Sequence, residues 1–185
     1  MYHIKNDKRS QTSARLICEA MKRLLDNKTT DKISITELQK ESTVSRATFY
    51  RLFDRTEDVV AYMYAMTVQE VYSKYNELDE EDRPSLLYYF IEKIMENWRL
   101  FESIYAAGDL SMLFRIHQED MPEIFHLKIG EGGIKRDLYD YYSAMLTGII
   151  IGGLIAWIQH DRRETAQEIY EMLLEQMGTL IMFLV

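Results

Sequence analysis

The sequence predicts an all-α protein, and three observations lead to that prediction. Apolar residues recur at spacings of three and four along most of the 185 residues, which is the period of an amphipathic helix. No glycine occurs before Gly108, so the N-terminal half turns without the residue that most easily adopts a positive φ. No stretch shows the alternation of apolar and polar residues that is typical of a half-buried strand.

Charge is divided unevenly along the chain. Residues 1–60 hold 12 Lys and Arg against 9 Asp and Glu, a balance of +3, whereas residues 61–185 hold 10 against 21, a balance of −11. The two balances sum to the net charge of −8. A basic N-terminal part on an acidic body can orient one end of a molecule towards a polyanion such as DNA.

Cys18 is the single cysteine, which excludes a disulfide framework and a zinc site built from several cysteines. Its apolar neighbours predict a buried thiol in a reducing compartment, and residues 1–10 lack the apolar stretch of a signal peptide. We therefore expect a cytoplasmic protein. Residues 143–160 are uncharged but only marginally long for a membrane span, and their glycine spacing also suits a soluble bundle, so we expect no membrane association.

The first helix is expected over residues 11–25, where an apolar stripe faces a basic side. Ser34 and Glu37 then have the spacing of a capping box, in which the hydroxyl and the carboxylate satisfy free backbone N–H groups. A short helix is therefore predicted over residues 35–41.

Ser45 is a natural N-cap for a second short helix that ends near Phe53. Two short helices joined by a tight turn and braced by a longer helix can place the second one, the reading helix, in the major groove of DNA. The spacing is equally compatible with an ordinary amphipathic helix pair whose arginines are solvated. In the first interpretation the DNA contacts come from Ser45, Arg46, Ala47, Thr48, Tyr50 and Arg51, while Leu38, Val44, Phe49, Leu52 and Phe53 form a small core.

Residues 44–53, together with residues 54–60, resemble the signature of TetR-family regulators. That signature has valine-serine, a variable pair, threonine, phenylalanine or leucine, tyrosine, two further residues and phenylalanine, then a short link and a glutamate. The likeness extends upstream through Ile35 and Leu38 to Ala20 and Leu24, and it covers about fifty residues in all. It implies an all-helical fold, a homodimer made by the last two helices and a ligand cavity in the C-terminal part.

The same resemblance implies phosphate contacts from Ser34, Thr48, Tyr50 and the position of Thr56. Thr36, near the start of the helix after Ser34, and Arg55, beside Thr56, complete the expected DNA-binding set. The sequence departs from the pattern at three places, where Thr43 replaces a turn glycine, Ala47 replaces a glycine or similarly small residue, and Thr56 replaces a lysine. Thr43 is strained if its φ is positive.

The predicted domains are a helix-turn-helix domain over residues 1–55 and a helical ligand-binding and dimerisation domain over residues 56–185. We expect a repressor that binds a palindromic operator in double-stranded DNA as a homodimer and is released by a small apolar effector. In the alternative, the reading helix binds a protein partner. An enzyme is not expected, because no catalytic or metal-binding spacing is evident, and no cofactor is expected.

Lys5, Lys8 and Arg9 form a basic segment before the first helix. Two interpretations remain open from sequence: a flexible arm that reaches phosphates or the minor groove, and a disordered solubilising tail.

The C-terminal part is predicted to form helices near residues 56–78, 85–98, 100–107, 134–160 and 165–184, with an interrupted helical stretch at 109–127. Aromatic residues and methionines in this part suit an adaptable apolar pocket, although most such residues form plain core. The candidates for effector binding are Trp98, Phe101, Tyr105, Met112, Phe114, Arg115, His117, Phe125 and Tyr142. His117 and His126 match no metal-binding spacing, so no metal is expected.

Two apolar helices near the C-terminus could pack against a second copy as a four-helix bundle. The residues expected at this dimer interface are Gly148, Ile149, Gly152, Ile155, Ile169, Leu173, Met177 and Leu180.

Overall fold

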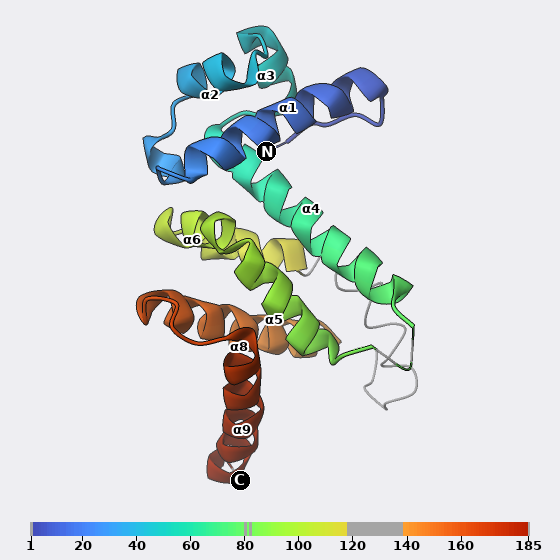
Figure 1. The fold of residues 1–185 in the computed structure, drawn as a ribbon, viewed down its shortest axis with the longest axis vertical. Coiled ribbons are helices and arrows are strands. Elements are labelled where there is room, and N and C mark those ends of the chain that lie inside the picture. Colours follow the sequence, from blue (N-terminus) through green and yellow to red (C-terminus); the bar gives the residue numbers. More distant parts are fainter. Residues whose placement is uncertain (1, 80, 82, 118–138, 185) are drawn as a thin grey trace. The chain divides into compact units, whose positions relative to one another are not determined.

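The computed structural model describes residues 2–184 except 80, 82 and 118–138 (Figure 1). Every regular element within these residues is a helix, apart from an isolated antiparallel bridge between Tyr2 and Phe53. The prediction of an all-α fold with about nine helices is confirmed. None of the helices described combines the length and the hydropathy that crossing a membrane requires.

The helices follow one another along the chain as α1 (Lys8–Leu25), the 3-10 turn η1 (Thr30–Lys32), α2 (Ile35–Ser42), α3 (Arg46–Leu52), α4 (Thr56–Glu77), α5 (Leu86–Glu96), α6 (Trp98–Ala106), α8 (Tyr139–Gln159) and α9 (Ala166–Leu184). Residues 110–117 are also helical. Gly108, two residues after the end of α6, adopts a φ of +72°, as expected for a glycine that ends a helix.

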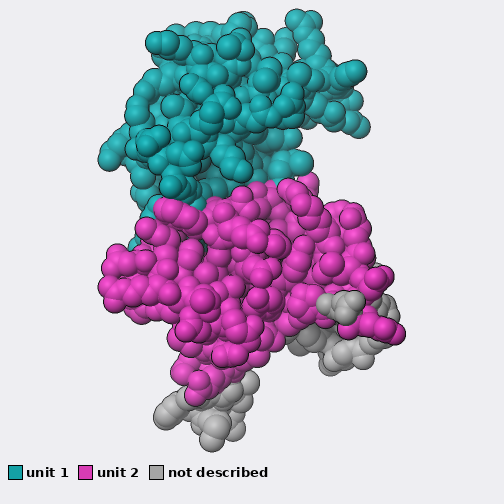
Figure 2. Space-filling model, viewed as in Figure 1, with its two compact units in different colours: residues 1–66, 99–110 teal, residues 67–98, 111–185 magenta. Residues whose placement is uncertain are grey.

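The chain divides into two compact units, shown in separate colours in Figure 2. Unit 1 consists of Met1–Met66 and Arg99–Leu110, and unit 2 consists of Thr67–Trp98 and Ser111–Val185. Unit 1 extends past the boundary predicted at residue 55, because it also contains the beginning of α4 and most of α6. The assignment of residues 1–55 to DNA binding and of residues 56–185 to ligand binding and dimerisation stays a prediction.

The core of unit 1 is built on the apolar face of α1. Asp7 caps this helix by accepting a hydrogen bond from the Ser10 backbone N–H at 2.8 Å, so α1 begins three residues before the predicted start. Its buried residues contact α2 and α3, and each fully buried large side chain contributes roughly 1.5–3 kcal/mol to folding. The buried side chains of these three helices include Ala14, Ile17, Ala20, Met21, Leu25, Leu38, Phe49 and Leu52.

Unit 2 has its own core where α5, α8 and α9 meet. Ile91, Trp157 and Ile169, one from each helix, are buried together there, and the Trp157 indole N–H donates to the Glu164 carbonyl at 2.9 Å. At Gly153 a Cβ would lie 3.2 Å from a methyl carbon of Leu173, which is tighter than most real contacts. The absence of a side chain at this position therefore allows α8 and α9 to approach closely.

The turn between α8 and α9 uses two consecutive residues with positive φ, Asp161 at 59° and Arg162 at 58°. Each such residue other than glycine costs about 1–2 kcal/mol of backbone strain. The Arg162 N–H donates to the Trp157 carbonyl at 2.9 Å, and its guanidinium lies 4.1 Å from the centroid of the Trp98 ring. This cation–π contact offsets part of the strain.

Candidate nucleic-acid interface

The segment before α2 forms the capping box that the sequence predicts. The Ser34 hydroxyl accepts from the Glu37 backbone N–H at 3.2 Å, and the Glu37 carboxylate accepts from the Ser34 backbone N–H at 3.1 Å. The same carboxylate accepts from the Lys28 ammonium at 2.5 Å, and this bond and those from Ser34 lower the pKa of Glu37 to about 2. Ser34 also donates its hydroxyl proton to Glu37 at 2.9 Å, so donation to a phosphate would replace that bond.

The turn between α2 and α3 depends on Thr43, which ends α2 in the left-handed conformation with φ 59° and ψ 13°. A β-branched residue is strained there, as the sequence suggested. Ser45 follows as the N-cap of α3, with its hydroxyl accepting from the Thr48 N–H at 3.3 Å. This prediction is confirmed.

The inward face of α3 is also as predicted. Phe49 and Leu52 of the helix are 1% exposed, and Phe53 directly after it is 0% exposed. Leu38 and Val44 are buried as well, so these five residues lie in the core of unit 1. The outward side of α3 is therefore fixed by the burial of its other side.

The outward face of α3 presents polar and aromatic side chains to solvent. Arg46, Ala47 and Arg51 are exposed, Tyr50 is 44% exposed, and Ser45 at the cap is exposed too. Positions 46, 47, 50 and 51 share one side because residues four apart lie above one another on a helix. Thr48 is half-buried, and its hydroxyl accepts from the Ser45 hydroxyl at 3.1 Å; Thr36 on α2 is exposed.

Arg46 and Tyr50 form a contact on this face. The guanidinium carbon of Arg46 lies 5.5 Å from the centroid of the Tyr50 ring, and Nη2 donates to the tyrosine hydroxyl at 3.4 Å. A planar, permanently charged guanidinium held over a ring retains most of its N–H donors for an acceptor such as a base edge or a phosphate.

At the start of α4 the two residues predicted to contact DNA, Arg55 and Thr56, differ in their exposure to solvent. Thr56 is 8% exposed and its hydroxyl donates to Glu57 at 3.3 Å. Arg55 is 64% exposed, with its guanidinium 3.9 Å from the buried Asp58 carboxylate, which also accepts from the Arg55 backbone N–H at 3.0 Å. Arg55 is therefore the more accessible of the two side chains.

The N-terminal segment lies against the end of α3. The His3 backbone N–H donates to the Leu52 carbonyl at 2.8 Å, and the His3 imidazole lies 3.2 Å from the Asp54 carboxylate. Tyr2 pairs with Phe53 through the bridge and packs its ring edge-on against Tyr62, with centroids 5.2 Å apart. Residues 2–7 are therefore neither a free arm nor a disordered tail, the two interpretations that the sequence leaves open.

Helix α6 is joined to the N-terminal helices within unit 1 by polar contacts between residues 73 positions apart. The Arg99 guanidinium donates to the Asp26 carboxylate at 2.9 Å and to the Asp26 carbonyl at 2.6 Å. The hydroxyls of Thr30 and Ser103, both buried, form a hydrogen bond. Nothing local in the sequence indicates either contact.

The residues predicted to bind an effector are divided between the units. Phe101 and Tyr105 belong to unit 1, where Phe101 packs near Tyr64 with ring centroids 6.5 Å apart. Unit 2 contains the buried Met112, the half-buried Trp98 and Phe114, the exposed Arg115 and the buried His117. Phe125 and the side chain of Tyr142 lie outside the described part.

His117 is the most deeply buried titratable candidate in unit 2, with 1% of its surface exposed. Its ring meets the Phe90 ring edge-on at a centroid distance of 5.2 Å. Burial lowers the pKa of His117 to about 4, so the imidazole is neutral at pH 7. In the described residues no group of three or more metal-binding side chains is found.

The residues predicted for a dimer interface also differ in exposure. Gly152 is exposed, Gly148, Ile149, Ile155 and Leu173 are partly exposed, and Ile169 is 3% exposed in the core of unit 2. The side chains of Met177 and Leu180 are outside the described part. Exposed apolar residues accompany them on the same two helices, namely Tyr141 and Met145 on α8 and Met172 and Leu174 on α9.

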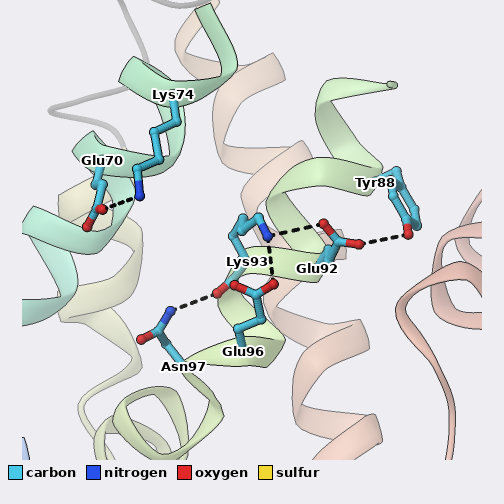
Figure 3. Close-up of polar contacts among 7 residues, drawn as sticks. All are labelled: Glu70, Lys74, Tyr88, Glu92, Lys93, Glu96 and Asn97. Atoms are coloured by element: carbon cyan, nitrogen blue, oxygen red, sulfur yellow. Dashed lines mark hydrogen bonds and ion pairs between the residues drawn. The ribbon is translucent and has the colours of Figure 1, made fainter. Parts of the chain in front are cut away.

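A polar network on α5 and the neighbouring turn of α4 occupies part of the surface of unit 2 (Figure 3). Lys93 lies 2.6 Å from Glu96 and 3.4 Å from Glu92, and the Tyr88 hydroxyl donates to Glu92 at 3.0 Å. Lys74 pairs with Glu70 at 2.6 Å on α4. These charges are paired on the surface, where an ion pair contributes about 0–1 kcal/mol, so the network marks no reactive group.

Comparison of the sequence with models of known protein families gives no match, and comparison with curated proteins gives none either. Comparison with solved structures finds similar folds, among them the crystal structure of Lin0861 from Listeria innocua. The TM-score is 0.73 and the sequence identity is 19%, and the match covers 96% of each chain. The chain thus shares its helical fold with Lin0861 over almost its whole length.

Proposed function

We propose that the protein is a transcriptional regulator that binds double-stranded DNA through α3. The observation that carries this proposal is the outward face of α3, where Arg46, Tyr50 and Arg51 are exposed on a short helix that is capped by Ser45 and anchored by buried Phe49. A helix presented in this way fits the major groove, and arginine is the side chain that most often reads guanine there.

The proposed active form is a homodimer that binds a palindromic operator. The exposed apolar residues of α8 and α9 support a self-complementary interface between two copies. A twofold axis then relates two α3 helices, which reach successive major grooves when they are about 34–36 Å apart.

The proposed effector is small and mostly apolar, and its binding in unit 2 releases the repressor from the operator. Ser143 and Thr147, one turn apart on α8, are 2% and 1% exposed, and their hydroxyls have no hydrogen-bond partner among the described residues. Burying a hydroxyl without a partner costs about 1–3 kcal/mol, so an effector with a polar group would be stabilised by reaching them.

The proposal is tested by selecting binding sites from random duplex DNA and measuring the affinity of Arg46→Ala and Tyr50→Ala for the selected site. Both variants should lose site-specific binding while melting like the parent protein, because both side chains are exposed. Arg163→Ala, which removes an exposed arginine in unit 2, is the control and should bind normally. Unchanged affinity in both α3 variants contradicts the proposal, and the absence of any salt-dependent binding of the parent to duplex DNA would favour a protein partner instead.

A further inference from the structure

Three basic side chains from separate segments of unit 1 line one pocket. Lys5 comes from the N-terminal segment, Arg9 from the first turn of α1 and Arg51 from the last turn of α3. The pocket has a volume of about 210 Å³ and is completed by His3, Asp7, Ser10 and Leu52. Since a water molecule takes up roughly 30 Å³, the pocket has room for a group of several heavy atoms.

The walls of this pocket are held by hydrogen bonds on both sides. Ser10 is 6% exposed, and its hydroxyl accepts from the Lys5 backbone N–H at 3.1 Å. His3 is tied to the end of α3 by its N–H bond to the Leu52 carbonyl at 2.8 Å and by its contact with Asp54. The chain on either side of Lys5 is therefore fixed, and the lysine is not carried on a free tail.

The charge of the lining is strongly positive. Lys5, Arg9 and Arg51 stand against a single carboxylate, that of Asp7, which accepts the capping hydrogen bond of α1. None of the three basic side chains forms an ion pair with a described residue. The N-terminus of the 18-residue α1 adds the positive end of a helix dipole.

We propose that this pocket binds a phosphate group, and, on the assumption that the protein binds DNA as proposed above, that the group is a backbone phosphodiester beside the groove that α3 enters. Arginine and lysine are the donors that phosphate oxygens prefer, and two guanidinium groups with one ammonium provide more donors than one phosphodiester needs. Docking of the N-terminal segment on the end of α3 brings Lys5 to the same pocket as Arg9 and Arg51.

The test compares the double variant Lys5→Gln and Arg9→Gln with a control that removes the same charge elsewhere in unit 1, Lys22→Gln and Lys32→Gln. Affinity for duplex DNA is measured from low to moderate salt. Each neutralised phosphate contributes about 0.9 to the magnitude of the slope of log affinity against log salt. A dimer has two such pockets, so the pocket variant should reduce the magnitude of the slope by about two. The affinity of the pocket variant for DNA should fall by about tenfold at low salt, uniformly across sequences. The control should lose less affinity and less of the salt slope than the pocket variant.

A second arm measures thermal melting in inorganic phosphate and in chloride at equal ionic strength. The parent and the control should melt at a higher temperature in phosphate, and the pocket variant should lose this difference. If the salt slope is unchanged but the phosphate effect is lost, the pocket takes free phosphate and not DNA. If both are unchanged, the proposal is wrong. If the parent does not bind DNA at all, the proposed function fails, and the phosphate arm alone decides the pocket.

Discussion

The guanidinium of Arg46 lies over the ring of Tyr50, 5.5 Å from its centroid, on the exposed side of α3. An exposed cation–π contact contributes about 0.5–1 kcal/mol, which is enough to favour one orientation of a long side chain before any DNA is bound. The arginine is thus partly organised for recognition by its neighbour one helical turn away.

A prediction follows for Tyr50. Tyr50→Phe keeps the ring and removes only the hydroxyl, whose hydrogen bond from Arg46 is long at 3.4 Å, so it should bind the selected operator more tightly than Tyr50→Ala. In a double-mutant cycle with Arg46→Ala, the coupling to Tyr50→Ala should be about 0.5–1 kcal/mol. Fluorescence anisotropy with labelled operator compares the two Tyr50 variants, and urea denaturation of the parent, Arg46→Ala, Tyr50→Ala and the double variant measures the coupling. Equal losses from Tyr50→Phe and Tyr50→Ala would assign the hydroxyl a direct contact with DNA.

Replacing Thr43 should stabilise the protein. Thr43→Gly removes the side chain from a residue held at φ 59°, where a residue with a Cβ costs about 1–2 kcal/mol, and part of this gain is offset by the greater freedom of glycine in the unfolded chain. We expect a net gain of about 0.5–1 kcal/mol in urea denaturation. Thr43→Ala, which keeps the Cβ, is the control and should gain less; if it gains as much as Thr43→Gly, backbone strain is not the cause.

The capping box should make stability depend on acid. The pKa of Glu37 is lowered from 4.5 to about 2, chiefly by the hydrogen bond from Lys28 and then by those from Ser34. A carboxyl whose folded pKa is depressed contributes stability that is fully present above its unfolded pKa and is lost as pH falls towards the folded value. Glu37→Gln should therefore melt at a lower temperature than the parent at neutral pH. The difference between their melting temperatures should shrink as the pH falls from 4.5 to 2. A deficit that stays constant over this interval would contradict the role of the charge.

The buried pair Thr30 and Ser103 should behave as a coupled unit. Ser103→Ala leaves the Thr30 hydroxyl buried without its partner, which costs about 1–3 kcal/mol, and Thr30→Val does the same to Ser103. The double variant should be clearly more stable than the sum of the two losses predicts, because both hydroxyls are then absent. Denaturation of the four proteins measures the coupling; additive losses would show that the hydroxyls do not depend on each other.

Local signals in the sequence predict the local parts of the candidate interface. The capping box of Ser34 and Glu37 and the N-cap at Ser45 each involve residues three apart, so chemistry alone indicates them. The inward face of α3 follows from apolar spacing in the same way. The sequence places the start of α1 three residues too late because the polar residues 8–10 resemble a tail, whereas Asp7 is in fact the helix cap.

The parts that the sequence does not reveal depend on residues far apart in the chain. Phe101 and Tyr105 are aromatic residues in a helical segment, and nothing near them indicates that they belong with the N-terminal helices of unit 1. The pairing of Tyr2 with Phe53 likewise joins segments that are distant in sequence. Such contacts depend on how the helices pack in three dimensions, and the residue pattern within one helix does not predict them.

The bridge between Tyr2 and Phe53 also has a practical consequence for anyone handling the protein. It holds the beginning of the chain against the final turn of the helix proposed to read DNA. An affinity tag or a fluorescent fusion joined ahead of Tyr2 would start beside Phe53, the residue that follows this helix, and would crowd the surface proposed to bind duplex DNA. An assay on such a fusion would report the accessibility of the tag junction together with the affinity for the operator.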